Sequence, residues 1–571
     1  MRLKGNPVSE GIAIGNVYIY RTVSPVIEEK HISPEEVPMA ESRLEQVKKT
    51  CKKELEEILM QMTDRDKAKI FEAHIEIIED EVLFDEIQDE ISLSLCAPDY
   101  AVYKVFGQHA QIIGKAKDPI IRERAADLID VRNRILREWS GTGEKNLSCL
   151  PEPSIVVAGD LLPSDTATLD RKNVLGIVTE TGGATSHTAI IARNYGIPAI
   201  LGVADAMNLL HGGEIIAVDA VCGEVLTGLN ETETAFYQNK RAEHCKAVHD
   251  IERYLSAEAV TKDGIKADIG LNIGSADQQT LEKCKYVDMV GLFRTEFLYM
   301  ESDVLPDEET QFEAYKRVLL ALGDKPVILR TLDIGGDKVL PSLPCSKEEN
   351  PFLGVRALRL CFSKPEVFRT QLRAALRASV YGNLWLMFPM VGSLDDLRRA
   401  KLKLAQVMDE LSAEGVLFNK DIKLGVMIEI PSIALMADIV AQEVDFASIG
   451  TNDLCQYTLA ADRVNPGVCD YYQSFHPGLF RLIGYAAKAF ADAKKPIGVC
   501  GELGGDPLAA PVLFGLGVRE LSMNMSAIAK IKKILSELSL PEMEKMARKV
   551  LSMDTEQTVK QYLRGELASL L

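Results

Sequence analysis

The sequence predicts a multidomain α/β protein in which a β/α domain carries an inserted all-helical bundle and is followed by a C-terminal (β/α)8 barrel of the TIM type. Three observations favour this fold class. The chain has 571 residues, more than one hydrophobic core usually accommodates. Its hydrophobic period changes from strand-like to helical and back again in the N-terminal part. Short apolar runs then alternate with helical stretches to the C-terminus.

The N-terminal part has a β-like run on each side of a helical region. GIAIGNVYIY alternates like a strand, whereas amphipathic segments from Glu35 to about Ser140 predict helices. Strand-like runs return after GTGEKN as PSIVVAGD, VLGIVTE, EIIAVDA and EVLTGL, so we expect residues 1–22 to pair with 145–228. The bundle, residues 23–144, would then be an insertion into the β/α domain.

The C-terminal part has the repetition of a barrel. Residues 229–255 are polar with helical spacing and predict a linker helix, and residues 256–571 form the predicted barrel. Its candidate strands are IKADIGLNIG, DMVGLFRTE, PVILRTLDIGG, LWLMFPMV, KLGVMIEIPS, FASIGTND, PIGVCGE and ELSMN. Barrel active sites form at the C-terminal ends of the strands, so the residues that close these runs are the functional candidates.

Composition excludes several classes of protein. Lys and Arg number 65 and Asp and Glu 84, and the net charge of -19 repels nucleic acid and anionic lipid. The eleven cysteines contain no CxxC pair, which argues against a disulfide framework or a zinc site and fits a reducing cytoplasm. The N-terminus lacks the apolar segment of a signal peptide, and charges interrupt every apolar stretch, so we expect neither export nor membrane insertion.

Polar side chains close five of the predicted barrel strands. They are Arg294, Arg330, Glu429, Asn452 with Asp453, and Cys500 with Glu502. Taken singly, each arginine has an ordinary interpretation as a structural ion pair and Cys500 as a buried thiol. Together with Arg356 and Arg463, the strand-end arginines predict a pocket for a ligand with phosphate, carboxylate or both.

Two of these residues suit a magnesium ion. Glu429 and Asp453 supply two carboxylates, which fits a Mg²⁺ that keeps its other positions for water and substrate oxygens. Arginines beside magnesium favour phosphoryl transfer, because its transition state spreads negative charge over oxygens that fixed cations stabilise.

A histidine stands in TGGATSHTAIIAR, directly after a Gly-Gly loop and before a helical pattern. His187 is therefore expected at a helix N-terminus, where free N–H groups and the helix dipole favour an anion. A phosphorylated histidine is one interpretation and a hydrogen-bonded capping histidine is the structural alternative. A metal ligand is less favoured, because no other histidine or cysteine lies at ligand spacing.

Several motifs together resemble those of the phosphoenolpyruvate-utilising phosphotransferases. They are GGATSHTAIIAR, GLFRTEFLYM, RTLDIGGDK, NPFLGVRALR, SIGTNDLCQYTLAADR and GVCGELGGD, and the resemblance runs from residue 1 to about 570. The branch that serves the bacterial sugar phosphotransferase system is the most similar. Other branches carry an ATP-binding domain, whereas the insertion here, with KIFEAHIEIIEDE and RERAADLIDVR, resembles a module that recognises a small phosphocarrier protein. Ala184 departs from the larger residue frequent in the family and implies only altered loop packing.

The resemblance implies a role for each candidate residue. His187 would accept the phosphoryl group of phosphoenolpyruvate and pass it to the histidine of the carrier, and Cys500 would protonate the enolate to give pyruvate. The implied substrate contacts are Arg294, Arg330, Asn452, Asp453 and Arg463, with Lys338 and Arg356 as further phosphate contacts. Glu429 and Asp453 would bind Mg²⁺, and His74 and Arg124 would contact the carrier.

The resemblance also implies a homodimer through the barrel and a β/α domain that swings between the barrel and the carrier. Two other functions stay open. A metal-dependent lyase of pyruvate-like substrates could use the same barrel without His187. A non-catalytic regulator phosphorylated on His187 would tolerate the loss of Cys500 and Glu429.

Overall fold

A computed structural model of the chain describes residues 1–20, 27–61, 65–114, 119–141, 147, 150–170, 172–183, 186–300, 304–335, 343, 348–465 and 467–571. The chain divides into two compact units, Met1–Val248 and His249–Leu571. Each unit has its own hydrophobic core. Within the described residues, no helix is both long enough and apolar enough to cross a bilayer.

A mixed eight-stranded sheet in the first unit draws its strands from two separate parts of the sequence, in the order β1-β8-β7-β3-β4-β5-β6-β2. The strands are β1 (Arg2–Lys4), β2 (Asn6–Ser9), β3 (Ile12–Tyr20), β4 (Ser154–Ala158), β5 (Val174–Thr179), β6 (Ala199–Leu201), β7 (Ile215–Asp219) and β8 (Glu224–Leu226). β3 lies between β7, which is antiparallel to it, and β4, which is parallel to it. The predicted pairing of the N-terminal run with the strands after the bundle is therefore confirmed.

Both faces of this sheet are buried. Val156 and Ala158 of β4 belong to one apolar cluster, and Ile155 and Val157 belong to another, as alternation along a strand requires. Three short helices accompany the strands: α6 (Pro163–Ala167), α7 (His187–Tyr195) and α8 (Ala206–Leu209).

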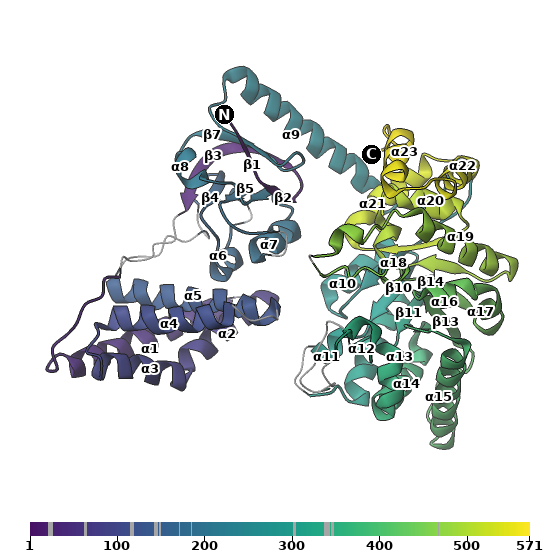
Figure 1. The fold of residues 1–571 in the computed structure, drawn as a ribbon, viewed down its shortest axis with the longest axis horizontal. Coiled ribbons are helices and arrows are strands. Elements are labelled where there is room, and N and C mark those ends of the chain that lie inside the picture. Colours follow the sequence, from purple (N-terminus) through teal and green to yellow (C-terminus); the bar gives the residue numbers. More distant parts are fainter. Residues whose placement is uncertain are drawn as a thin grey trace. The chain divides into compact units, whose positions relative to one another are not determined.

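The described residues of the inserted bundle form five helices between β3 and β4 (Figure 1). They are α1 (Val37–Gln61), α2 (Arg65–Glu79), α3 (Glu81–Ser92), α4 (Pro98–Gly114) and α5 (Pro119–Ser140). The segment KIFEAHIEIIEDEVLFDEIQDEI, within the predicted helical region, is divided between α2 and α3. The break occurs at Asp80, whose side chain accepts a hydrogen bond from the Leu83 N–H at 3.1 Å and so caps the start of α3.

Hydrogen bonds also join the bundle to the β/α part. The fully buried Asp130 of α5 accepts hydrogen bonds from the backbone N–H of Ser164 at 3.0 Å and from its hydroxyl at 2.8 Å. Within the β/α part, Tyr20 at the end of β3 donates its hydroxyl to Asp165 at 2.5 Å. The bonds of Asp130 to Ser164 fix one placement of the bundle relative to the β/α part, because these buried groups lose their partners if the two parts separate.

The second unit contains a closed barrel of eight strands with parallel neighbours, which confirms the predicted TIM-type fold. The strands are β9 (Asp268–Ile273), β10 (Met289–Arg294), β11 (Pro326–Arg330), β12 (Asn383–Phe388), β13 (Lys423–Ile428), β14 (Phe446–Ile449), β15 (Ile497–Val499) and β16 (Glu520–Met523). A helix, α9 (Glu231–Glu252), precedes the barrel in the chain.

Helices surround the barrel strands (Figure 1). They are α10 (Gln278–Lys283), α11 (Phe297–Met300), α12 (Glu308–Leu322), α13 (Ala357–Ser363), α14 (Pro365–Ala378), α15 (Leu394–Ala413), α16 (Pro431–Leu435), α17 (Ala437–Glu443), α18 (Thr451–Leu459), α19 (Pro477–Asp492), α20 (Ala509–Gly515), α21 (Met525–Ser536), α22 (Leu540–Leu551) and α23 (Glu556–Glu566). A large apolar core forms where these helices cover the outward faces of the strands.

Candidate active site

Alternation along the strands points the strand-end side chains into the mouth of the barrel. The barrel interior is filled by a cluster that includes Leu292, Ile328 and Met427. A residue two positions further along a strand points to the same side. The residues so placed are Arg294, Arg330 and Glu429. The core pattern of each strand thereby directs a charged group to the mouth.

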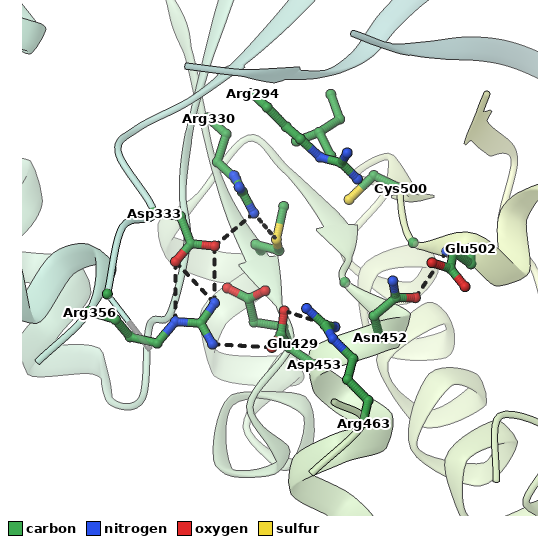
Figure 2. Close-up of a pocket in the computed structure, with 15 residues that line it drawn as sticks. Arg294, Arg330, Asp333, Arg356, Glu429, Asn452, Asp453, Arg463, Cys500 and Glu502 are labelled. Carbon is green, nitrogen blue, oxygen red and sulfur yellow. Dashed lines mark hydrogen bonds and ion pairs between the residues drawn. The ribbon is translucent and has the colours of Figure 1, made fainter. Parts of the chain in front are cut away.

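These side chains line a pocket of about 280 Å³ together with residues from the following loops (Figure 2). Its lining includes Arg294, Arg330, Asp333, Arg356, Glu429, Asn452, Asp453, Arg463, Cys500 and Glu502. Asn452 and Asp453 lie in the first turn of α18, and Cys500 follows β15 directly. The structure thus brings together every predicted barrel residue except Lys338, which lies outside the described residues.

Side chains whose charges alternate in sign form a row of ion pairs along the wall of the pocket. In order, the residues are Glu296, Arg330, Asp333, Arg356, Asp453 and Arg463. At one end, Arg330 donates to Glu296 at 2.8 Å and contacts Asp333 at 2.9 Å. All three residues are buried. A buried charge without a partner would be strongly unfavourable, so the alternation is what allows these charges inside the protein.

Arg356 continues the chain of ion pairs toward α18. Its guanidinium donates to both carboxylate oxygens of Asp333 at 3.1 Å and to Asp453 at 3.2 Å (Figure 2). Arg463 lies 3.8 Å from the other oxygen of Asp453. Arg356 also donates to the Tyr457 hydroxyl, which in turn donates to a backbone carbonyl of the same loop region. Arg356 is therefore held from several sides.

Arg294 differs from the other arginines. Arg294 is exposed, yet the surrounding protein still desolvates its guanidinium, and this desolvation together with the neighbouring Arg330 lowers its pKa. For Arg330, the carboxylates of Glu296 and Asp333 outweigh the effect of burial and raise the pKa. Among the described residues, Arg294 has no ion pair, and Figure 2 shows its guanidinium beside Cys500. Its donors are therefore available to an anionic ligand.

The two predicted metal ligands supply oxygens that fit a cation. Glu429 is fully buried and accepts the Met390 N–H through Oε1 at 2.5 Å, while its Oε2 accepts no hydrogen bond from the described residues. Burial and the nearby carboxylate of Asp453 raise the pKa of Glu429 to about 8. A cation would satisfy the orphaned oxygen. Within the described part of the chain no group of three His, Cys, Asp or Glu side chains is arranged to hold a metal ion. Two carboxylates, with water and substrate oxygens at the other positions, form a set that Mg²⁺ accepts.

Cys500 has the properties of a proton donor rather than a nucleophile. The thiol is buried and donates to the Ile449 carbonyl at 3.8 Å, and burial raises its pKa to about 11. At neutral pH it is therefore a neutral S–H. The loop around it is held on two sides, because Asn272 donates to the Cys500 carbonyl at 2.9 Å and Asn452 accepts the Glu502 N–H at 3.1 Å.

His187 is the first residue of α7, as the sequence pattern predicts for a helix N-terminus. Ser186 caps the helix, since its hydroxyl accepts the Ala189 N–H at 3.3 Å. Gly182 has a φ of 106°, which favours glycine at that position of the loop. The side chain of His187 and the residues 184–185, which include Ala184, lie outside the described part.

One of the two predicted carrier contacts is wrong. His74 is completely buried beside Asp127 and Asp130, at 3.5 and 4.0 Å, and so cannot present its ring to a docked protein. Its helical position on the inward face of α2 explains the burial, and the sequence pattern was equally compatible with that face. Arg124 is exposed on α5, so its role stays a prediction.

Sequence reasoning missed two acidic residues of the site, Glu296 and Asp333. Both stand within three residues of a strand-end arginine, in GLFRTEF and ILRTLD. The need of the buried Arg330 for a carboxylate close in the chain could have identified Asp333. Glu296 pairs with Arg330, 34 residues further along the chain, and no local pattern records that contact.

Comparison with known proteins first shows the class of protein to which the chain belongs. The chain matches three family models: the N-terminal region of PEP-utilising enzymes over residues 4–124, their mobile domain over 150–223 and their PEP-binding domain over 249–540. It is therefore a phosphoenolpyruvate-utilising enzyme.

Similarity over the whole chain defines the family. The chain is 41% identical to the phosphoenolpyruvate-protein phosphotransferase of Priestia megaterium, over 99% of this chain and 98% of the relative. It is 40% identical to that of Bacillus subtilis (strain 168), over 98% and 99%. An NMR structure of an Enzyme I protein matches 42% of this chain and 99% of its own length, at 36% identity and a TM-score of 0.38. The chain belongs to the phosphoenolpyruvate-protein phosphotransferase family.

Proposed function

We propose that this enzyme transfers the phosphoryl group of phosphoenolpyruvate to His187 and then to a histidine of a small phosphocarrier protein, releasing pyruvate, as the first step of a sugar phosphotransferase system. The observation that carries the proposal is the barrel pocket, in which Arg294 has no ion pair to any described residue while the neighbouring arginines are fixed by carboxylates. Such a pocket suits a small ligand with both a phosphate and a carboxylate.

In the first half-reaction the P–O bond of phosphoenolpyruvate breaks and a P–N bond to the imidazole of His187 forms. Arg294, Arg330, Arg463 and Asn452 orient the substrate, with Asp453, Arg356 and Lys338 as further contacts. Glu429 and Asp453 would hold Mg²⁺, which neutralises phosphate and enolate charge when bound. The electron pair of the enolate takes the proton of the Cys500 thiol, and solvent then reprotonates the sulfur.

The second half-reaction moves the phosphoryl group from His187 to the carrier. We propose residues 1–22 with 145–228 as the phosphohistidine domain, 23–144 as the carrier-binding bundle, 229–255 as the linker, and 256–571 as the substrate-binding barrel, which would also form a homodimer. Since His187 and the pocket belong to different domains, the phosphohistidine domain would swing between the two reactions.

The test is incubation with phosphoenolpyruvate and Mg²⁺, following pyruvate together with an acid-labile, base-stable phosphoryl group on the protein. We expect stoichiometric labelling in the wild type and none in His187→Ala. Pyruvate-forming activity that survives in His187→Ala would instead favour a metal-dependent lyase on the same barrel. Labelling that survives in Cys500→Ala and Glu429→Gln would indicate a phosphorylated regulator. Transfer of the label to added carrier tests the second half-reaction.

A further inference from the structure

We propose that Glu296 is a positioning residue that fixes the guanidinium of Arg330 and, through Asp333, that of Arg356. This inference rests on the proposed function, since it assigns how the arginines of that same pocket are held. Glu296 follows β10 and is only 3% exposed. It does not line the pocket and so would act through the arginine rather than on the ligand.

One oxygen of Glu296 joins two parts of the pocket wall. Oε1 accepts a hydrogen bond from Nη2 of Arg330 at 2.8 Å and another from the backbone N–H of Asp333 at 2.9 Å. Asp333 in turn receives Arg356 through both carboxylate oxygens. Glu296 therefore positions the side chain of Arg330 directly. It also positions the backbone of Asp333, which binds Arg356.

The backbone around Glu296 is fixed independently. Gln371 of α14 is fully buried, accepts the Leu332 N–H at 2.8 Å and donates to the Thr295 hydroxyl at 3.0 Å. Thr295 donates to the Arg330 carbonyl at 3.1 Å. The loops after β10 and β11 are thereby joined to each other and to α14. With the backbone held in this way, the carboxylate of Glu296 has little freedom other than its own rotamer.

The second carboxylate oxygen of Glu296 supports a functional role for this residue. Oε2 is buried and accepts no hydrogen bond from the described residues. An unsatisfied buried carboxylate oxygen is unfavourable for folding, and such exceptions concentrate at functional sites.

A positioning role and a purely electrostatic role of Glu296 predict opposite effects on the binding of phosphoenolpyruvate. Glu296→Gln removes a negative charge beside an anion pocket, so a purely electrostatic role predicts tighter binding of phosphoenolpyruvate. A positioning role predicts weaker binding, because the amide oxygen that takes the place of Oε1 is a weaker acceptor for the Arg330 guanidinium than a carboxylate oxygen. Glu296→Asp keeps the charge but withdraws the oxygen by about one methylene, so only the positioning role predicts a loss.

The experiment measures the Kd of phosphoenolpyruvate with Mg²⁺ in the full-length His187→Ala background, where no turnover occurs, and KM and kcat in the His187 background. Glu443→Gln is the matched control, since it removes the carboxylate partner of another arginine, Arg398, and neither residue lines the pocket. We expect Glu296→Asp, which withdraws the acceptor, to raise Kd and KM and to lower kcat/KM by about 100-fold, the effect of a displacement of about 1 Å. We expect Glu296→Gln to raise Kd and KM by a smaller factor, and Glu443→Gln to leave both unchanged.

Other outcomes overturn the inference. If Glu296→Gln tightens the binding of phosphoenolpyruvate and Glu296→Asp changes nothing, Glu296 contributes only charge. If kcat falls in proportion to an unfolded fraction while Kd and KM stay unchanged in the folded fraction of both variants, its role is structural. If phosphoenolpyruvate does not bind the His187→Ala protein at all, the proposed function fails first and this inference with it. Binding in that protein with unchanged Kd, KM and kcat in both Glu296 variants refutes the positioning role alone.

Discussion

Replacing Asp333 by Asn tests whether the alternating ion pairs hold the barrel pocket together. Asp333 is 6% exposed and lies between Arg330, at 2.9 Å, and Arg356, which donates to both of its oxygens. Removing one partner of a buried ion pair costs about 3–5 kcal/mol. Each arginine keeps a second carboxylate, Glu296 or Asp453, so we expect the low end of that range, about 3 kcal/mol.

The two tryptophans provide the assay. Trp139 lies in the bundle and Trp385 in barrel strand β12, so a Trp139→Phe background leaves a fluorescence signal from the barrel alone. Urea unfolding is compared with and without Asp333→Asn, and Asp492→Asn serves as a control because the exposed pair with Lys488 on α19 is expected to contribute about 0.3–0.5 kcal/mol. A loss below about 1 kcal/mol, similar to that of the control, would refute the argument that the ion-pair chain stabilises the pocket.

Three further predictions follow from other residues. Cys500→Ala removes the buried S–H, and we expect pyruvate release to fall by about 100- to 10,000-fold, with the Kd of phosphoenolpyruvate in the His187→Ala background unchanged. Burial raises the thiol pKa to about 11. A pH–rate profile of the wild type should therefore show no titration of this thiol between pH 6 and 9. Burial raises the pKa of Glu520, at the N-terminal end of β16, from 4.5 to about 7, so the folded barrel binds this proton more tightly than the unfolded chain and loses stability as the pH rises from about 4.5 to 7. Glu520→Gln should flatten this slope and raise the urea midpoint at pH 8 but not at pH 4.5, and an unaltered slope would contradict the assignment. Ser186→Ala removes the N-cap of α7 and should destabilise that helix by about 1 kcal/mol, seen as faster hydrogen exchange of its amides while those of α5 stay unchanged.

The barrel could be predicted from the sequence because its strands are buried on both faces. Continuous apolar runs such as VGLF and VMI stand out against helical stretches, and the polar residue that ends each run marks the mouth. The exact strand ends could not be predicted. The run LWLMFPMV continues past Phe388, where β12 ends, because residues that leave the sheet at the barrel mouth can remain buried and apolar.

The contacts within the site were harder to predict from the sequence. Strand ends predict that Arg294 and Arg330 lie close together, yet which arginine is paired and which is open depends on Glu296 and Asp333 in the following loops. The orientation of a helix is similarly ambiguous. The charged residues of α2 are distributed around the helix, so the sequence does not show which side of α2 faces inward. Burial of His74 beside Asp130 depends on packing against α5, which no local pattern records.

The bundle is the crossover connection of a parallel strand pair, and this restricts how it can move. Asn16 of β3 lies beside Ser154 of β4, but the chain leaves β3 only at Tyr20, four residues further on. The two attachments are therefore separated by about 13 Å along the sheet, at about 3.3 Å per residue. A domain fastened at two separated points cannot rotate freely, as one on a single tether would, and the hydrogen bonds of Asp130 to Ser164 also oppose tilting about the line that joins those points. A shortened chain without the bundle would need an extended linker across that distance to keep β3 and β4 paired.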